Sequence, residues 1–517
     1  MNKILEILDN NPIRSSFFIG LFFTLAFQPF NLIPFAIIFL YLVRRIDKSS
    51  SYKEAFLVGF AFYTGHYATL APWVMNVSKH IGPVLYLGYV ALVLVVALYY
   101  GVGALITKKV GLKYLPFVFI FIEFTRQFGE LKFPWGYSGY IFGFNNYFIQ
   151  SADIFGIFGL SLIFYIFVLL IYYGLKYKNK LFYNVAAILF IANYVYGFVT
   201  YEKSESKLNK MTVGVLQSNI TQERKWDKDF RDSTYIIYSS LAQKVATDST
   251  DLIVWPETSS PSYLQVMKYD RNRVLEIVKK TNTYNFVGGL RLEEDKTKKR
   301  GYRFYNSMFL FDGLGNNVDT YDKSVLVPFG EYLPFTTYFP FLNNIDFGQS
   351  DFSSGERENL IKVKDALIST FICFEILSPI YTRHQVAKGS NLIVTTSNDA
   401  WFDFMEPQQH FEFARFRAVE NRRYLVRSGS IGISAIVTES GKILNSIDVK
   451  ERGAFLEKVK LFGHRTIYNK YGDWIVYFAI FVLLVRFSVL GKKYLSNRKT
   501  KNEPIENFEN NPEKSFD

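Results

Sequence analysis

The sequence is poor in cysteine. Cys373 is the only one in 517 residues, which excludes an internal disulfide and a zinc cluster built from cysteines. Arg-rich helical segments and zinc-finger spacings are also missing, so nucleic acid is not the expected partner despite a net charge of +13. A lone thiol is either a core residue or a nucleophile, and only its surroundings can decide between them.

Apolar and aromatic residues are abundant. They make up 49% and 18% of the chain, yet the mean hydropathy is only +0.08, which indicates membrane segments diluted by a large polar region. A membrane helix needs about 20 apolar residues, and several of the runs are close to that length. We therefore predict a polytopic α-helical membrane domain with about eight transmembrane helices. The runs cover residues 15–27, 32–43, 55–73, 84–106, 114–124, 154–175 and 181–199 within an N-terminal bundle (1–200), and 474–490 near the C-terminus.

Basic residues gather in alternate connections between these runs. With the N-terminus in the cytoplasm, the inner connections carry clusters such as Arg44-Arg45 and Lys108-Lys109, whereas the outer connection at 73–82 carries only Lys79. This is the positive-inside pattern. It predicts that both termini are cytoplasmic and that residues 205–465 lie outside. The polar composition of the tail, 496–517, predicts disorder.

The outer region alternates β-rich runs with helical stretches. Short runs that begin at Met211, Asp251, Asn285, Leu367 and Asn391 are bounded by polar turns and are typical of strands. Residues 408–424 show helical spacing, and 428–447 are typical of a hairpin. Together they indicate a mixed α/β domain of about 250 residues, within the usual size of a single domain.

Three motifs in this region carry chemistry. Glu257 ends the apolar run DLIVWPET, where loss of water would suit a general base, although a helix cap or a surface acid also fits. Lys323 precedes an apolar run and could stabilise an oxyanion, with Glu331 as a partner. Cys373 ends the run LISTFIC, two residues before Glu375. A base, a lysine and a thiol together make a complete acyl-transfer site.

Three local questions remain open. His384 and His410 lie outside the predicted spans, so a Cys/His pair is still a candidate site. The aromatic run after Lys323, which includes Phe339 and Phe341, is either ordinary packing or an arm that dips into the membrane. Residues 123–150, with Trp135, form either an aromatic belt or a lipid-lined floor beneath the outer domain.

The motifs resemble a known superfamily. WPET at Glu257, YDKSVLVPFGEYLPF at Lys323 and ICFEI at Cys373 resemble the three signatures of the nitrilase, or carbon–nitrogen hydrolase, superfamily, and SNDAWF at 397–402 also fits. Within a frame of seven spans before the domain and one after it, the chain is similar to the apolipoprotein N-acyltransferase family. The resemblance implies an αββα sandwich beside the membrane helices.

The resemblance also implies roles. Glu257 would be the base, Lys323 the oxyanion-stabilising lysine and Cys373 the nucleophile, supported by Glu331 and Glu375. The thiol would take an acyl chain from a phospholipid as a thioester and pass it to the α-amino group of a lipoprotein's diacylglyceryl-cysteine. We expect a monomer in the bacterial inner membrane, with no cofactor or metal. Residues expected to contact substrate or form a lid are Phe374, Trp401, Phe339, Phe341 and Trp135.

The chain departs from the family pattern at three places. Phe374 stands where tyrosine is expected, Asp403 where glycine is usual, and 428–432 (SGSIG) where an asparagine-containing stretch is common. Two competing functions are a membrane-tethered amidase that hydrolyses small external amides, and a transporter or scaffold. A transporter would carry paired intramembrane charges or broken helical repeats, and neither is evident.

Overall fold

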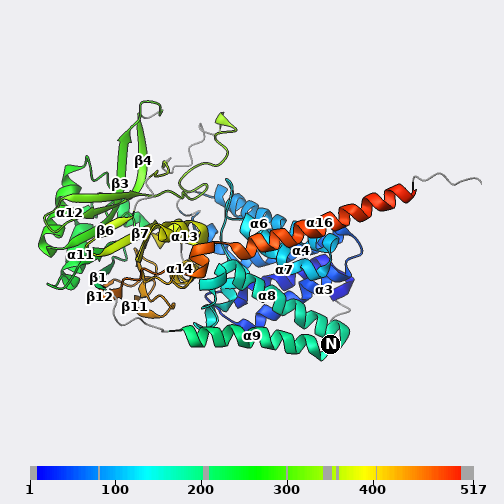
Figure 1. Cartoon of the computed structure of the whole chain (residues 1–517). Coiled ribbons are helices and arrows are strands. Elements are labelled where there is room, and N and C mark those ends of the chain that lie inside the picture. The colour runs from blue at the N-terminus through cyan, green and yellow to red at the C-terminus, as the bar shows by residue number, and fades with distance from the viewer. Residues whose placement is uncertain are drawn as a thin grey trace, which may run out of the picture.

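A helical bundle and a domain of two stacked sheets lie side by side (Figure 1). The computed structural model describes residues 8–77, 79, 82–201, 209–298, 301–341, 352–356, 360–402 and 405–501. The departure predicted at Asp403 lies outside these residues, as does most of the tail.

Each predicted apolar run contains a helix. Four helical segments are long and apolar enough to cross a membrane, at 85–110, 152–177, 180–200 and 474–496 among the described residues. The final helix was predicted to end at 490 and the tail to begin at 496, but α16 continues to Lys501. The bundle helices are α2 (Pro12–Phe23), α3 (Phe39–Lys48), α4 (Tyr52–Leu70), α6 (Val84–Val110), α7 (Leu115–Thr125), α8 (Ala152–Tyr177), α9 (Lys180–Thr200) and α16 (Trp474–Lys501).

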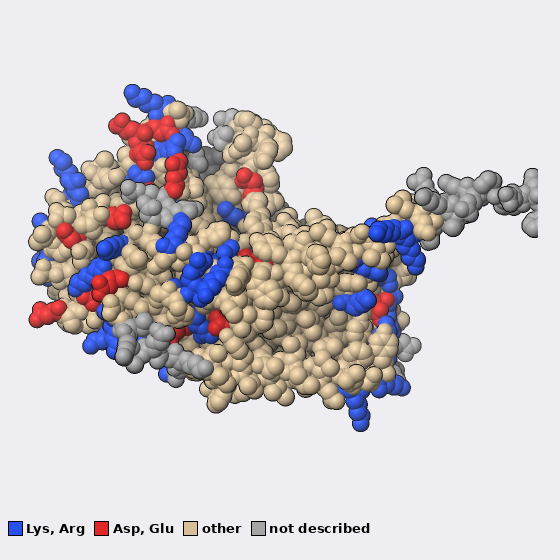
Figure 2. Space-filling view, viewed as in Figure 1, with Lys and Arg blue, Asp and Glu red and all other residues tan. Residues whose placement is uncertain are grey.

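The basic connections meet at one end of the bundle. Lys176 pairs with Asp47 at 2.5 Å, and Lys108 Nζ donates to the Asp47 carbonyl at 3.1 Å. Arg486 on α16 donates to the Val110 carbonyl at 2.8 Å, at the same end of α6. Figure 2 shows Lys and Arg at this far end, separated from the charged sheet domain by a broad band of other residue types. The basic clusters of separate connections therefore lie together at one end of the bundle.

Two six-stranded sheets form the second domain. In the first, the order is β12-β1-β2-β3-β4-β5, with β1, β2 and β3 parallel. In the second, the order is β11-β10-β9-β8-β7-β6, with β7, β8 and β9 parallel. The strands are β1 (Lys210–Gln217), β2 (Leu252–Val254), β3 (Tyr284–Glu294), β4 (Tyr302–Phe311), β5 (Asn317–Asp322), β6 (Ile361–Val363), β7 (Ala366–Ile372), β8 (Leu392–Ser397), β9 (Leu425–Gly429), β10 (Ser434–Val437), β11 (Ile443–Ile447) and β12 (Gly453–Lys460).

The sheets pack face to face with helices outside them. One apolar cluster joins the sheets, with Val254 of β2 and Ile372 of β7 among its members. A second cluster holds α11 (Arg231–Val245) and α12 (Lys268–Thr281) on the first sheet. A third holds α13 (Pro379–Ala387) and α14 (Glu406–Asn421) on the other. The layers are therefore α-β-β-α, as predicted, and each predicted run of the outer domain contains a strand or helix.

Helix α14 belongs to both parts of the molecule. Phe411, Ala414 and Ala418 pack on the second sheet, while Phe413 and Phe416 join the core of the bundle. Nearly all of its residues are buried, whereas the helical spacing in the sequence marks only the face with Phe411, Ala414 and Ala418. The side chain of Gln409 makes four hydrogen bonds to the bundle. Trp135 and Trp73 donate to its Oε1, and its Nε2 donates to the carbonyls of Gln28 and Leu70.

Candidate active site

The three predicted reactive side chains follow strand ends in the two facing sheets. Glu257 comes three residues after β2, Lys323 comes directly after β5, and Cys373 begins the short 3-10 helix η7 (Cys373–Leu377) after β7. Lys323 Nζ lies 3.9 Å from Glu257 Oε1, and the charges of both residues act on the Cys373 thiol. The sandwich thus brings together three residues that are distant in sequence.

Glu257 is a buried carboxylate held from two sides. Asn306 Nδ2 donates to Oε1 at 2.6 Å, and the backbone N–H of Asn398 donates to Oε2 at 2.6 Å. Burial raises the pKa of Glu257, against the opposing charge of Lys323. A carboxyl group with a raised pKa is a stronger base than an exposed one, and the two donors fix its direction.

Lys323 remains an ammonium although only 1% of its side chain is exposed. Burial alone would lower its pKa, but the carboxylates of Glu331 and Glu257 outweigh burial and raise it. Glu331 is 2.8 Å from Nζ and also accepts from the Val327 N–H at 3.0 Å. The site therefore holds a buried positive charge that Glu331 keeps in place.

Cys373 has a backbone conformation that few non-glycine residues adopt. Its φ is +53°, in the left-handed region, exactly where β7 gives way to η7. Burial raises the pKa of its thiol well above the usual value, Glu257 raises it further, and Lys323 lowers it. The resting thiol is therefore protonated, and it needs a nearby base to become a nucleophile.

Glu375 ties the nucleophile to the lysine loop. Its carboxylate accepts from the N–H groups of Ser324 (2.6 Å), Val325 (2.9 Å) and Ile372 (2.7 Å), and from the Tyr321 hydroxyl (2.9 Å). Burial raises the pKa of Glu375 to about 7, and the backbone N–H donors oppose that rise. This buried carboxylate fixes the spacing between the segments that carry Lys323 and Cys373.

The predicted substrate-contact residues occupy different settings. Phe374 is 8% exposed and packs with the core of the bundle, while Trp401 is half-buried in η8 (Asp399–Trp401). Phe339 and Phe341 are 52% and 65% exposed, although both are large and apolar. Trp135 is buried and donates to Gln409, so it lies at the contact between bundle and sheet domain.

Sequence reasoning missed several polar groups around Glu257. Asn306 and Asn398 hold its oxygens, and Gln222 accepts from Asn398 Nδ2 at 3.2 Å. From the same short helix, α10 (Gln222–Trp226), comes Lys225, a buried residue whose Nζ has no hydrogen-bond partner among the described residues. No local pattern marks these residues, because tertiary packing alone brings them to the site.

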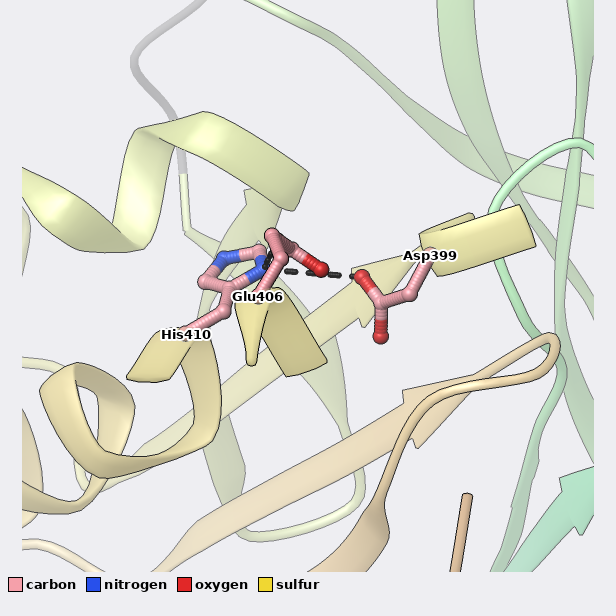
Figure 3. A group of neighbouring side chains, drawn as sticks. All are labelled: Asp399, Glu406 and His410. Atoms are coloured by element: carbon pink, nitrogen blue, oxygen red, sulfur yellow. Dashed lines mark ion pairs between the residues drawn. The ribbon is translucent and has the colours of Figure 1, made fainter. Parts of the chain in front are cut away.

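A second group of titratable side chains adjoins the Cys373 backbone. Asp399, Glu406 and His410 offer ligand atoms within 4.8 Å of one another, a donor set that could hold a cation (Figure 3). The guanidinium of Arg427 already supplies positive charge there, with Nη2 3.0 Å from Asp399 Oδ2. Of the two histidines left open from the sequence, His410 reaches the reactive segment, whereas His384 is exposed on α13.

Comparison with known proteins covers both parts of the chain. Residues 19–170 match the profile of the apolipoprotein N-acyltransferase N-terminal domain, and residues 212–461 match that of carbon-nitrogen hydrolase. An apolipoprotein N-acyltransferase from Geobacter metallireducens is 31% identical over 454 residues, which is 83% of this chain and 85% of the relative. The chain belongs to the apolipoprotein N-acyltransferase family. This membrane enzyme is thus an acyltransferase of the nitrilase superfamily.

Other relatives agree. An apolipoprotein N-acyltransferase from Bdellovibrio bacteriovorus is 30% identical, with 93% of each chain covered, and one from Rickettsia typhi is 28% identical, with 91% of this chain and 97% of the relative covered. Among solved structures, Saccharomyces cerevisiae Nit3, a nitrilase-superfamily member, is 20% identical over 50% of this chain and 93% of its own, with a TM-score of 0.38.

Proposed function

We propose that this N-acyltransferase works by a ping-pong reaction in which Cys373 carries the acyl chain, Glu257 moves the protons and Lys323 stabilises the oxyanion. The observation that carries the proposal is the meeting of a buried carboxylate, a buried ammonium and a thiol at the strand ends, with Lys323 Nζ 3.9 Å from Glu257. The donor is a membrane phospholipid, and the acceptor is the diacylglyceryl-cysteine of a lipoprotein.

The first half-reaction moves an acyl chain from an ester to a thioester. Glu257 takes the thiol proton while Sγ of Cys373 attacks the ester carbonyl of the phospholipid. The carbonyl oxygen becomes an oxyanion beside Lys323. When the C–O bond breaks, Glu257 returns the proton to the leaving oxygen, and a lysophospholipid departs.

The second half-reaction forms an amide. The neutral α-amino group of the lipoprotein attacks the thioester carbonyl, and Lys323 again faces the oxyanion. Glu257 removes the proton that the nitrogen must lose and passes it to the thiolate of Cys373 as the C–S bond breaks. Because a thioester also reacts with water, the apolar packing of Phe374 beside the nucleophile favours transfer over hydrolysis.

We further propose that both termini are cytoplasmic, that the chain crosses the inner membrane about eight times, and that the sheet domain is periplasmic. Four long apolar helices support this topology, as do the basic residues gathered on Asp47 at the far end of the bundle. The exposed rings of Phe339 and Phe341 are suited to an arm that enters the lipid and admits acyl chains.

A phospholipid with a radiolabelled acyl chain tests the proposal. Purified wild-type enzyme in micelles should gain one acyl group on Cys373, identified by mass spectrometry, and should lose it when a diacylglyceryl peptide with a free amine is added. Cys373→Ala should gain no label. Ammonia release from small amides with no labelled thioester would contradict the proposal and favour a membrane-tethered amidase.

A further inference from the structure

His410 contacts the backbone of the nucleophile itself. Its Nε2 lies 3.1 Å from the carbonyl oxygen of Cys373, 37 residues away in sequence. On the other side of the ring, Nδ1 lies 3.1 Å from Glu406 Oε1 and 3.5 Å from Asp399 Oδ1 (Figure 3). All three side chains are at most 2% exposed. The imidazole therefore bridges a buried acidic pair and the residue that would carry the acyl group.

The direction of the bond to Cys373 follows from its chemistry. A backbone carbonyl only accepts hydrogen bonds, so Nε2 must carry the proton whether the ring is neutral or charged. Arg427 Nη2 lies 3.3 Å from Nδ1 and 3.0 Å from Asp399 Oδ2. The guanidinium and the acids thus orient the ring from behind. With Arg427 in place, the cluster is supplied with the positive charge that a metal ion would otherwise bring.

The contact from His410 adds a side-chain hold to an unusual backbone conformation. Cys373 has a φ of +53°, and a non-glycine residue in this region is strained unless its surroundings hold it. On the strand side, Glu375 accepts from the Ile372 N–H at 2.7 Å. On the other side, His410 reaches the Cys373 carbonyl from a different helix, α14. The two contacts pin the backbone before and after the nucleophile.

We propose that His410 is a positioning residue whose Nε2–H holds the Cys373 carbonyl, and so keeps the thiol directed at the substrate ester. The inference rests on the proposed role of Cys373 as nucleophile. His410 does not exchange a proton with substrate, and its charge state is not part of the proposed steps. Its contribution is to the rate of Cys373 acylation rather than to lipid binding.

Two variants of His410 distinguish a hydrogen-bond donor from a ring that only fills space. His410→Gln keeps an N–H that can reach the carbonyl, and His410→Phe keeps a ring without a donor. We expect His410→Phe to slow Cys373 acylation about 10-fold, the size of one lost hydrogen bond, with the KM for phospholipid unchanged. His410→Gln should stay within about 3-fold of wild type. His384→Leu, at an exposed position on α13, is the matched control.

Acyl-thioester on Cys373 is measured by mass spectrometry over time, and folding by thermal unfolding. Equal rates for His410→Phe and wild type would overturn the proposal, as would equal loss in folded His410→Gln and His410→Phe. If His410→Phe does not fold, His410→Asn, whose amide is too short to reach the carbonyl, replaces it in the same comparison. A stoichiometric metal in the purified enzyme that is lost in His410→Gln would also overturn it. Absence of thioester in the wild type would instead contradict the proposed function.

Discussion

In the proposed reaction, the proton on Cys373 has to leave a site that contains several charged groups. Glu257 can accept it only while ionised, and its burial works against ionisation. Lys323 offsets that burial, and Lys225 adds a second positive charge from helix α10. Because Lys225 Nζ has no hydrogen-bond partner among the described residues, its effect on Glu257 is exerted through space. The reactivity of the carboxylate therefore depends on both ammonium groups.

Lys225→Met is expected to move the acid limb of the pH profile of thioester formation upward, by about one pH unit or more. Burial lowers the pKa of Lys225 to about 8, so the wild-type residue is charged through most of the neutral range. Its removal raises the pKa of Glu257, and Glu257 is then protonated at a higher pH. Initial rates of Cys373 acylation between pH 5 and 9 measure the shift.

Lys225→Arg keeps the charge and should restore the wild-type profile. Lys228→Met, an exposed lysine three residues on, serves as the control. A Lys225→Met profile with an unchanged acid limb would contradict the through-space effect. If only the KM for phospholipid rose, while a neutral small ester reacted normally, Lys225 would be a phosphate-binding residue instead.

Among single residues, the sequence predicts those that border apolar runs. Glu257 and Cys373 stand at the ends of such runs and Lys323 stands just before one, so their motifs are visible without a structure. Lys225 and Asn306 have no such signal, since their roles depend on which loops meet across the two sheets. Phe374 stands where the family pattern has tyrosine, and in the structure it packs in the core of the bundle.

At the scale of elements, Glu375 links two chain segments that no hydrogen-bond ladder joins. Glu375→Gln should lower the free energy of unfolding by about 2 kcal/mol or more, because the amide group would turn N–H donors toward the N–H groups of Ile372 or Ser324. It should also slow acylation, since the lysine loop would lose its anchor. Thermal unfolding and thioester formation report the two effects.

Glu276→Gln on the surface of α12 is the comparison for this change, because its carboxylate is exposed to solvent and faces only Arg273 and Lys280. Glu276→Gln should change the free energy of unfolding by no more than about 0.5 kcal/mol and should leave the acylation rate unchanged. A stable and fully active Glu375→Gln enzyme would show that the carboxylate does not hold the two segments together.

The arm with Phe339 and Phe341 is the second element with a testable role. Replacing both rings with glutamine should slow acylation by phospholipid micelles about 10-fold, while a short water-soluble ester should react at the wild-type rate, because only the long-chain donor has to leave a lipid phase. Leu314→Gln, at a 74% exposed turn residue, is the control. An unchanged rate of acylation by phospholipid micelles would contradict the proposed role of these two rings.

The sequence pattern predicts this arm only as one of two alternatives. Aromatic density alone does not separate a packed core from an exposed surface, and the 52% and 65% exposure of the two rings was decided by the path of the loop. Helix α14 is predicted in part. Its spacing predicts the face toward the sheet, but Phe413 and Phe416 on the other face have their partners in a bundle more than 200 residues earlier.

At the scale of the whole molecule, topology can be read from single thiols. In a Cys373→Ala background, Lys228→Cys should react with a membrane-impermeant maleimide on intact spheroplasts, and Lys178→Cys should react only after lysis. The first residue lies in the sheet domain and the second in the connection between α8 and α9. The reverse labelling pattern would place the sheet domain in the cytoplasm.

Charge and hydropathy predict the division into bundle and sandwich well, because both signals are summed over many residues. They are less informative about the individual spans. Helix α7 covers only Leu115–Thr125, and residues 126–151 after it form turns and the 3-10 segment η5 (Ser138–Phe144), which a hydropathy window does not distinguish from helix. The exact number of crossings thus depends on the packing of short elements against one another.

Helix α14 also has a consequence for how the enzyme melts. Gln409 is bound by four groups of the bundle, and its neighbour His410 is bound to the nucleophile, so neither part can open without disturbing the other. Heating should therefore produce one cooperative transition rather than two. A soluble fragment of residues 209–466 would expose Phe413 and Phe416 and should aggregate. A single transition would mean that the sheet domain, although distinct in architecture, is not a separate unit of folding.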